Sequence, residues 1–339
     1  SRKPDNIIRK ELEIKSLCSA LEKELPRFMS GFFAYLRSNV LPMSRLAYLR
    51  DISFFCRYLI NETDLTSASS PVDIRESDFD RIEGSDINMF IDYCRCYAVE
   101  GEKNIHIYEN DQRSLARKKS SLSVLFKQLY RDGFMSRNIT DSFNPIRVPK
   151  PGEKQIKALQ DDEVLKMLDA VVSGNNLTDK EKEYWRKTKL RDKAILLIFL
   201  TYGLRISELQ QLNLSSFNFN RGEFIIHRKR SKESLMPLNN TTREAVLQYI
   251  ETERAKEGLD TEHEDALFLS LQKRRMTERQ IREMVKKYTS IGLETARAAG
   301  YSPHKLRATA ATSLIGRGNS IYDVAALLDH EQVTTTQLY

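Results

Sequence analysis

The feature that most constrains the fold is a break near the middle of the chain, where proline and basic residues interrupt long helical patterns. From Asn144 the segment reads Asn-Pro-Ile-Arg-Val-Pro-Lys-Pro-Gly-Glu-Lys, with three prolines in eleven residues. Proline fixes φ and lacks a backbone donor, so this stretch favours an extended connection over a helix. We therefore predict two domains, residues 1–144 and 158–339, joined by a linker over residues 145–157.

The N-terminal domain is predicted to be helical throughout. Apolar residues recur at helical spacing in two stripes through residues 12–60, and again through residues 85–99 and 114–132. Four helices with short connections make a small helical domain. The last of these helices begins within a cluster of basic side chains, namely Arg113, Arg117, Lys118 and Lys119.

The C-terminal domain is predicted to be mainly α with one small β-hairpin. Residues 217–227 and 234–238 alternate like two strands around a charged tip at residues 228–233. Helical patterns surround this hairpin, over residues 161–170, 190–201, 205–212, 241–256, 277–291, 304–316 and 320–328.

Charge and composition indicate which kind of partner and which cellular compartment to expect. The 54 Lys and Arg residues outnumber the 47 Asp and Glu residues, so a polyanion is the first partner to consider. No apolar run approaches the roughly 20 residues of a membrane span, and no signal-peptide core is seen, so we expect a cytoplasmic protein. The cysteines lack zinc-site spacing, which predicts buried free thiols and no metal site; they are Cys18, Cys56, Cys94 and Cys96.

An arginine follows a break in the most apolar helix of the chain. The segment from Gly203 to Leu209 reads Gly-Leu-Arg-Ile-Ser-Glu-Leu, which places Arg205 at a structured corner. Taken alone, this arginine is better explained as a surface residue or as the partner of Glu208 in a local ion pair than as a functional residue. The hairpin tip then presents Lys229, which can reach a ligand lying across the domain face, although a basic hairpin tip is often only solvated.

Two histidines, a second arginine and a tyrosine follow in the last 36 residues. His304 and Arg307 stand at i and i+3, so they share one helical face and form a pair of phosphate donors. His330 ends the segment Leu-Leu-Asp-His, and Tyr339 follows nine residues later. Each of these signals is weak by itself, but the ordered set is specific.

The ordered set resembles the tyrosine recombinase (phage integrase) family. That family carries G-x-R-x-x-E-L, a hairpin lysine, H-x-L-R, and L-G-H followed nine residues later by a tyrosine nucleophile. The resemblance spans about residues 156–339, and the N-terminal domain fits the family's core-binding domain in size and position. It implies a two-domain, C-shaped clamp on DNA. Two positions depart from the family pattern, Asp329 in place of glycine and Ala308 in place of a second histidine.

The resemblance also implies a role for each candidate residue. A phosphodiester cleaved without metal needs its non-bridging oxygens neutralised, which two guanidinium groups do well, and its departing 5′-oxygen protonated. The expected roles are phosphate neutralisation by Arg205 and Arg307, protonation of the leaving oxygen by Lys229, handling of the tyrosine proton by His304, a phosphate hydrogen bond from His330, orientation of Arg205 by Glu208, and nucleophilic attack by Tyr339. We expect no cofactor.

The expected DNA contacts outside this catalytic set come from both domains. In the N-terminal domain they are Arg113, Arg117, Lys118 and Lys119, on a helix that would face the duplex. At the hairpin tip they are Arg228 and Lys232. The expected partners are double-stranded DNA with an inverted-repeat site, three further copies of the chain on two duplexes, and accessory proteins at the bacterial nucleoid. By the same resemblance, we expect the natural chain to continue past Tyr339 into a segment that packs on a neighbouring protomer.

Several functions are compatible with these residues. The moderate length most resembles Xer-type recombinases, which resolve chromosome dimers. An integrase or transposase of a mobile element, or a DNA invertase, has the same catalytic set. A DNA-binding regulator without strand exchange and a type IB topoisomerase are alternatives of other classes.

Overall fold

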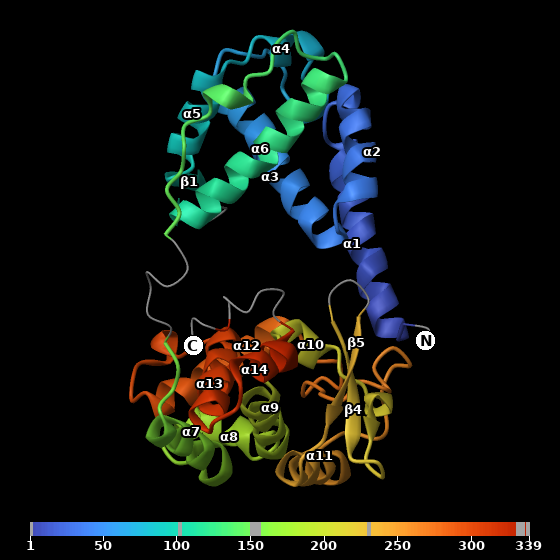
Figure 1. The fold of residues 1–339 in the computed structure, drawn as a ribbon, viewed down its shortest axis with the longest axis vertical. Coiled ribbons are helices and arrows are strands. Elements are labelled where there is room, and N and C mark those ends of the chain that lie inside the picture. The colour runs from blue at the N-terminus through green and yellow to red at the C-terminus, as the bar shows by residue number, and fades with distance from the viewer. Residues whose placement is uncertain (1–2, 101–103, 150–156, 229–231, 330–335, 337–339) are drawn as a thin grey trace. The chain divides into compact units, whose positions relative to one another are not determined.

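The computed structural model describes residues 3–100, 104–149, 157–228, 232–329 and 336, and it divides into two compact units (Figure 1). The first unit is Ser1–Lys150 and the second is Pro151–Tyr339. Each unit has its own hydrophobic core. None of the helices within the described ranges has the length and apolar content needed to cross a bilayer.

The first unit is a helical domain with one added β-ribbon. Its longest helices, α1, α3 and α6, bury aromatic and leucine side chains against one another. The helices are α1 (Asp5–Lys23), α2 (Ser30–Asn39), α3 (Pro42–Glu62), α4 (Glu76–Asp80), α5 (Gly84–Tyr93) and α6 (Gln112–Arg131), with 3-10 turns at Arg27–Met29, Pro71–Asp73 and Thr140–Ser142.

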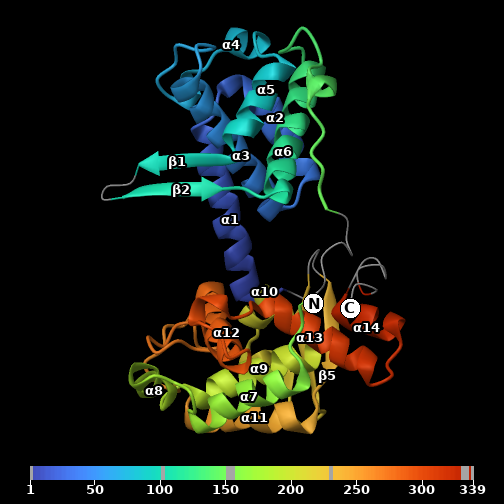
Figure 2. The same ribbon diagram turned by 90° about the vertical axis from the view of Figure 1, so that its left-hand side faces the viewer.

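The ribbon corrects the prediction of a helix over residues 85–99. Helix α5 ends at Tyr93, and the chain forms the antiparallel strands β1 (Cys96–Glu100) and β2 (Ile105–Glu109), which lie side by side in Figure 2. Tyr97 packs against the rings of Phe54 and Tyr108, with centroids 4.9 and 5.3 Å away. The ribbon exposes Cys96, whereas the other three cysteines are buried as predicted.

The second unit surrounds one buried helix, α9 (Lys189–Tyr202), which packs on α11 and α13. Most side chains of α9 are buried, and every residue from Ala194 to Leu200 is apolar. The other elements are α7 (Asp161–Ser173), α8 (Asp179–Trp185), α10 (Ile206–Gln210), α11 (Asn240–Thr252), α12 (Glu278–Gly292), α13 (Pro303–Gly316), α14 (Ile321–Leu328), and 3-10 turns at Leu214–Ser216 and Arg297–Ala299.

A small antiparallel sheet forms one side of this unit. Its strands are β3 (Phe217–Asn218), β4 (Glu223–His227) and β5 (Glu233–Pro237), in the order β3-β4-β5. The predicted first strand is therefore two strands, separated by a turn in which Gly222 has a φ of +66°. The sheet side chains alternate, so that Phe224 and Ile226 face the core while Ile225 is exposed. The main departure among the helices is α8, which the sequence patterns did not predict.

Candidate active site

The corner after α9 depends on Gly203. This residue ends α9 in the left-handed region, with a φ of +57°. A Cβ at this position would lie 2.6 Å from Leu328 Cδ2, too close for any packed atom. Glycine therefore allows both the reversal of the chain and the close approach of α14 to the end of α9.

Glu208 fixes both the backbone and the side chain of Arg205. The Arg205 backbone N–H donates to Glu208 Oε2 at 2.7 Å, and Arg205 Nη1 donates to Glu208 Oε1 at 2.7 Å. Glu208 is buried at 4% exposure, whereas the Arg205 side chain keeps 28%. The local ion pair is thus present, and it aims a partly exposed guanidinium from the N-terminus of α10.

Arg307 joins three elements beneath this corner. It projects from α13 and is 4% exposed. Its Nη1 donates to the Gly203 carbonyl at 2.7 Å, and its Nη2 donates to the Leu328 carbonyl. Arg205 Nη2 in turn donates to the next carbonyl, that of Asp329, at 3.0 Å. Two arginines that are 102 residues apart in the chain therefore converge on one turn at the end of α14.

His304 lies one turn before Arg307 in the first turn of α13. Partial burial of the ring lowers its pKa below the ordinary 6.5, and the charges of Arg307 and Lys305 lower it further. His304 is therefore mainly neutral at pH 7, and a neutral imidazole can accept a proton.

Asp329 caps α14 in the left-handed region, with a φ of +53°. Asp is among the few residue types other than glycine that adopt this conformation readily. Its Oδ1 lies 2.6 Å from Lys232 Nζ, and its Oδ2 lies 3.5 Å from Arg205 Nη1. Burial opposes ionisation of Asp329, but the ion pairs with Lys232, Arg228 and Arg205 outweigh it and hold the pKa of the carboxyl below its usual value.

Arg228 does not lie on an exposed hairpin tip, where the sequence pattern predicted it. Its side chain is 2% exposed, and its Nη2 donates to the Leu327 carbonyl at 2.6 Å. Burial lowers the pKa of this guanidinium. The reason is strand alternation, because Arg228 directly follows β4 and continues the inward-facing series of Phe224 and Ile226. Lys232, by contrast, has a 65% exposed side chain.

The remaining catalytic candidates are Lys229, His330 and Tyr339, and all three lie outside the described residues. The sequence places Lys229 directly after Arg228 and His330 directly after Asp329. The structure therefore describes Arg228 and Asp329, the residues that immediately precede Lys229 and His330 in the chain.

The basic cluster of the first unit is only partly available for DNA. Lys118 is buried, with its Nζ 3.6 Å from Asp51 Oδ1 and 4.8 Å from the centre of the Phe54 ring, so we withdraw it as a DNA contact. Lys118 shares the inner face of α6 with Leu115 and Leu122, three and four residues away, which is a signal the sequence already holds.

The other members of this cluster differ in their exposure and in their contacts with other protein groups. Arg117 is half-exposed but pairs with Asp51, and Lys119 donates to the Asn144 carbonyl at 2.6 Å. Arg113 is exposed. Arg113 is thus the member of the cluster best placed to meet a phosphate.

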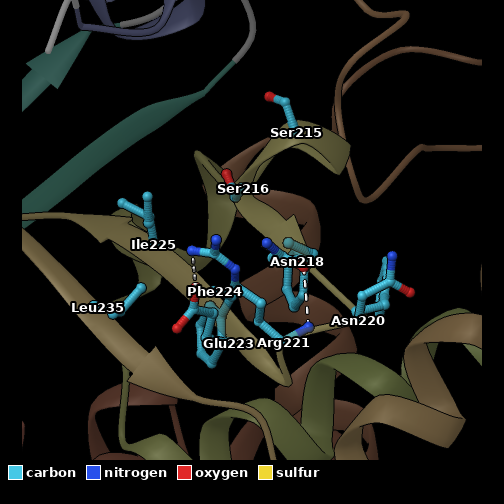
Figure 3. Close-up of a pocket in the computed structure, with 11 residues that line it drawn as sticks. Ser215, Ser216, Asn218, Asn220, Arg221, Glu223, Phe224, Ile225 and Leu235 are labelled. Atoms are coloured by element: carbon cyan, nitrogen blue, oxygen red, sulfur yellow. Dashed lines mark hydrogen bonds and ion pairs between the residues drawn. The ribbon is translucent and has the colours of Figure 1, made fainter.

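A surface hollow of the second unit lies beside the β3–β4 turn, as Figure 3 shows. Within it Arg221 Nη1 lies 3.9 Å from Glu223 Oε1, and the Arg221 backbone N–H donates to Asn218 Oδ1 at 3.0 Å. None of its lining residues is a candidate named above. Among the described residues there is also no cluster of His, Cys, Asp and Glu fit to hold a metal.

Comparison with known proteins agrees with this arrangement. The phage integrase family model matches residues 157–339, which is more than half of the chain. The chain is 32% identical, over 98% of its length and 86% of the relative's, to tyrosine recombinase XerC of Caldanaerobacter subterraneus subsp. tengcongensis. It is 30% identical to tyrosine recombinase XerD of Listeria innocua serovar 6a, over 86% of each chain.

The fold is also that of a solved recombinase. The structure of a lambda integrase tetramer bound to a Holliday junction is similar over 96% of this chain and 76% of that one, with 15% identity and a TM-score of 0.60. The family resemblance inferred from the sequence motifs is confirmed: the chain belongs to the phage integrase family and is a tyrosine recombinase.

Proposed function

We propose that this protein is a site-specific DNA recombinase that exchanges strands through a 3′-phosphotyrosine and a Holliday junction. The observation that carries this proposal is the convergence of Arg205 and Arg307 on the turn before His330. Guanidinium groups carry a permanent charge and forked donors, which suit the pentacoordinate phosphate formed during attack.

Each proposed step leaves its atoms and protons balanced. The Tyr339 oxygen attacks the phosphorus and its proton passes to neutral His304, while the bond from phosphorus to the 5′-oxygen breaks. Lys229 gives a proton to that 5′-oxygen, and His330 donates a hydrogen bond to the phosphate. A 5′-hydroxyl from the other duplex then attacks the phosphorus and returns its proton to Lys229, while the bond from phosphorus to the Tyr339 oxygen breaks and protonated His304 returns the proton to that oxygen. The strand is thereby rejoined without an external energy source.

The biological role that fits best is resolution of chromosome dimers in the bacterial cytoplasm, at the nucleoid. Its support is the similarity to proteins named XerC and XerD over most of the chain. The lambda integrase neighbour is a tetramer on a Holliday junction, which supports a tetramer on two duplexes here as well. We assign DNA binding by the first unit to Arg113, Arg117 and Lys119 on α6, with Arg113 the most accessible of the three.

The test is to map where the protein becomes covalently attached to genomic DNA of its source, and then to incubate it with that site carrying a nick. The nick lets a short strand diffuse away and traps the phosphotyrosine. We expect one inverted-repeat chromosomal position and a trapped adduct. Attachment at the ends of a mobile element would favour an integrase. Binding without an adduct would favour a regulator, and relaxation of a plasmid that lacks the site would favour a topoisomerase.

Two substitutions on α6 separate DNA contact from internal support. We expect Arg113→Ala to reduce the slope of log affinity against log salt by about one, with a stability change within about 0.5 kcal/mol. Lys118→Ala removes a buried partner of Asp51, so it should lower the free energy of unfolding by about 1–3 kcal/mol. DNA titrations at several salt concentrations and urea unfolding measure both quantities. A stable Lys118→Ala protein with the reduced salt slope would reverse the assignment.

A further inference from the structure

The carboxylate of Asp329 lies among the cations that surround the proposed phosphate site. It is 2.6 Å from Lys232 Nζ, 3.5 Å from Arg205 Nη1 and 3.9 Å from Arg228 Nη1, measured to the nearer oxygen in each case. A carboxylate and a phosphodiester offer guanidinium groups the same kind of acceptor, a pair of anionic oxygens. Asp329 therefore meets the same cations that a DNA phosphate would meet.

Arg228 gives a second, independent indication that this place is built for an anion. Its side chain is buried, and its Nε and Nη1 have no hydrogen-bond partner within the described residues. Asp329, at 3.9 Å, is too distant for a hydrogen bond and compensates only the charge. A buried cation with unfilled donors is costly, so an oxygen-rich anion that filled them would be bound favourably.

The position of Asp329 connects these cations to the chemistry. Arg228 and Lys232 flank the segment that contains Lys229, and Asp329 immediately precedes His330. The Asp329 carboxylate thus links the hairpin that carries the proposed acid to the turn that carries a proposed phosphate donor. The Asp329 carbonyl accepts from Arg205 at 3.0 Å, which adds the first arginine to the same assembly.

We propose that Asp329 is a positioning residue that occupies the anion site of the free protein and yields it to the DNA phosphate. This inference rests on the proposed function. Before DNA binds, the carboxylate holds Arg205, Arg228 and Lys232 together and compensates the buried charge. When a phosphate arrives, the same carboxylate competes with it for those cations. Removal of this one negative charge therefore lowers the stability of the free protein and raises the affinity of the site for phosphate.

The test uses the full chain with Asp329→Asn, because asparagine also tolerates the left-handed region and keeps the shape of the side chain. Thermal unfolding is followed without anion and with increasing inorganic phosphate, whose binding to the folded state raises the midpoint. We expect a lower midpoint without phosphate, and phosphate binding about tenfold tighter than wild type, equivalent to about 1.4 kcal/mol. Asp323→Asn is the matched control, since Asp323 is an exposed residue of α14 and its loss changes the net charge equally; it should change neither quantity appreciably.

A second variant separates charge from backbone strain. Asp329→Gly removes the carboxylate and also the cost of a side chain at positive φ. We expect it to tighten phosphate binding as Asp329→Asn does, whatever its stability. Phosphate affinity at or below the wild-type value in both variants would overturn the inference. Failure of the proposed function shows separately, as a wild-type protein that forms no adduct with nicked DNA, because the phosphate titration does not depend on strand cleavage.

Discussion

Replacing Tyr339 by phenylalanine is expected to abolish covalent attachment to DNA while leaving DNA binding unchanged. The substitution removes one oxygen, the proposed nucleophile, and keeps the ring. Without that oxygen the phosphotyrosine bond cannot form, so the adduct should fall by at least ~10⁴-fold, below detection. The measurement is the amount of labelled DNA that remains attached to the protein under denaturing conditions after incubation with the nicked site.

Tyr322→Phe is the matched control for this experiment. Tyr322 lies in the first turn of α14 and is 69% exposed, so loss of its hydroxyl should leave both adduct and stability as in the wild type. If Tyr339→Phe still formed the adduct, another residue would be the nucleophile. If both substitutions reduced the adduct equally, the loss could not be assigned to the Tyr339 oxygen.

Replacing Lys229 by alanine is expected to slow cleavage by about 10²–10⁴-fold, because no group then protonates the departing 5′-oxygen. A DNA substrate with sulfur at the 5′-bridging position should restore the rate, since a thiolate leaves without a proton. The same substrate should not restore Tyr339→Phe. Rates of adduct formation on oxygen and sulfur substrates, measured with both variants, provide the comparison.

Lys232→Ala is the informative companion variant on the same hairpin. Lys232 pairs with Asp329 and is not assigned the proton transfer, so any slowing that follows its loss should be the same on oxygen and sulfur substrates. If sulfur rescued Lys232→Ala and left Lys229→Ala slow, the role of acid would pass to Lys232.

The helices of the second unit could be predicted because their apolar patterns are long and their ends carry local signals. Gly203 marks the end of α9, and Thr277 with Gln280 forms a capping box at the start of α12. The β1–β2 ribbon was harder to predict. Ile87, Phe90 and Ile91 set a helical spacing that Cys94 extends, and strand character begins only where Tyr97 finds aromatic partners on other elements.

In the candidate site, too, features within one helix could be predicted from the sequence, whereas contacts between distant residues could not. The spacing of His304 and Arg307 follows from one helix, so the sequence predicts their shared face. The burial of Lys118 depends on Asp51, which lies 67 positions earlier in the chain. The contact between Arg228 and Leu327 spans 99 positions. The helical and strand periodicity of the sequence indicates that such a side chain is buried, but it does not identify the residue that it contacts. Long-range contacts of this kind depend on the tertiary fold.

The two arginines of this site also stabilise the fold of the second unit. Arg205 and Arg307 donate to the carbonyls of Gly203, Leu328 and Asp329, so they connect the ends of α9 and α14 with α10 and α13. Loss of either arginine would therefore remove hydrogen bonds that hold these helices together, as well as a cation of the proposed phosphate site. The presence of these two arginines in a sequence is therefore a sign of this fold as much as of strand cleavage.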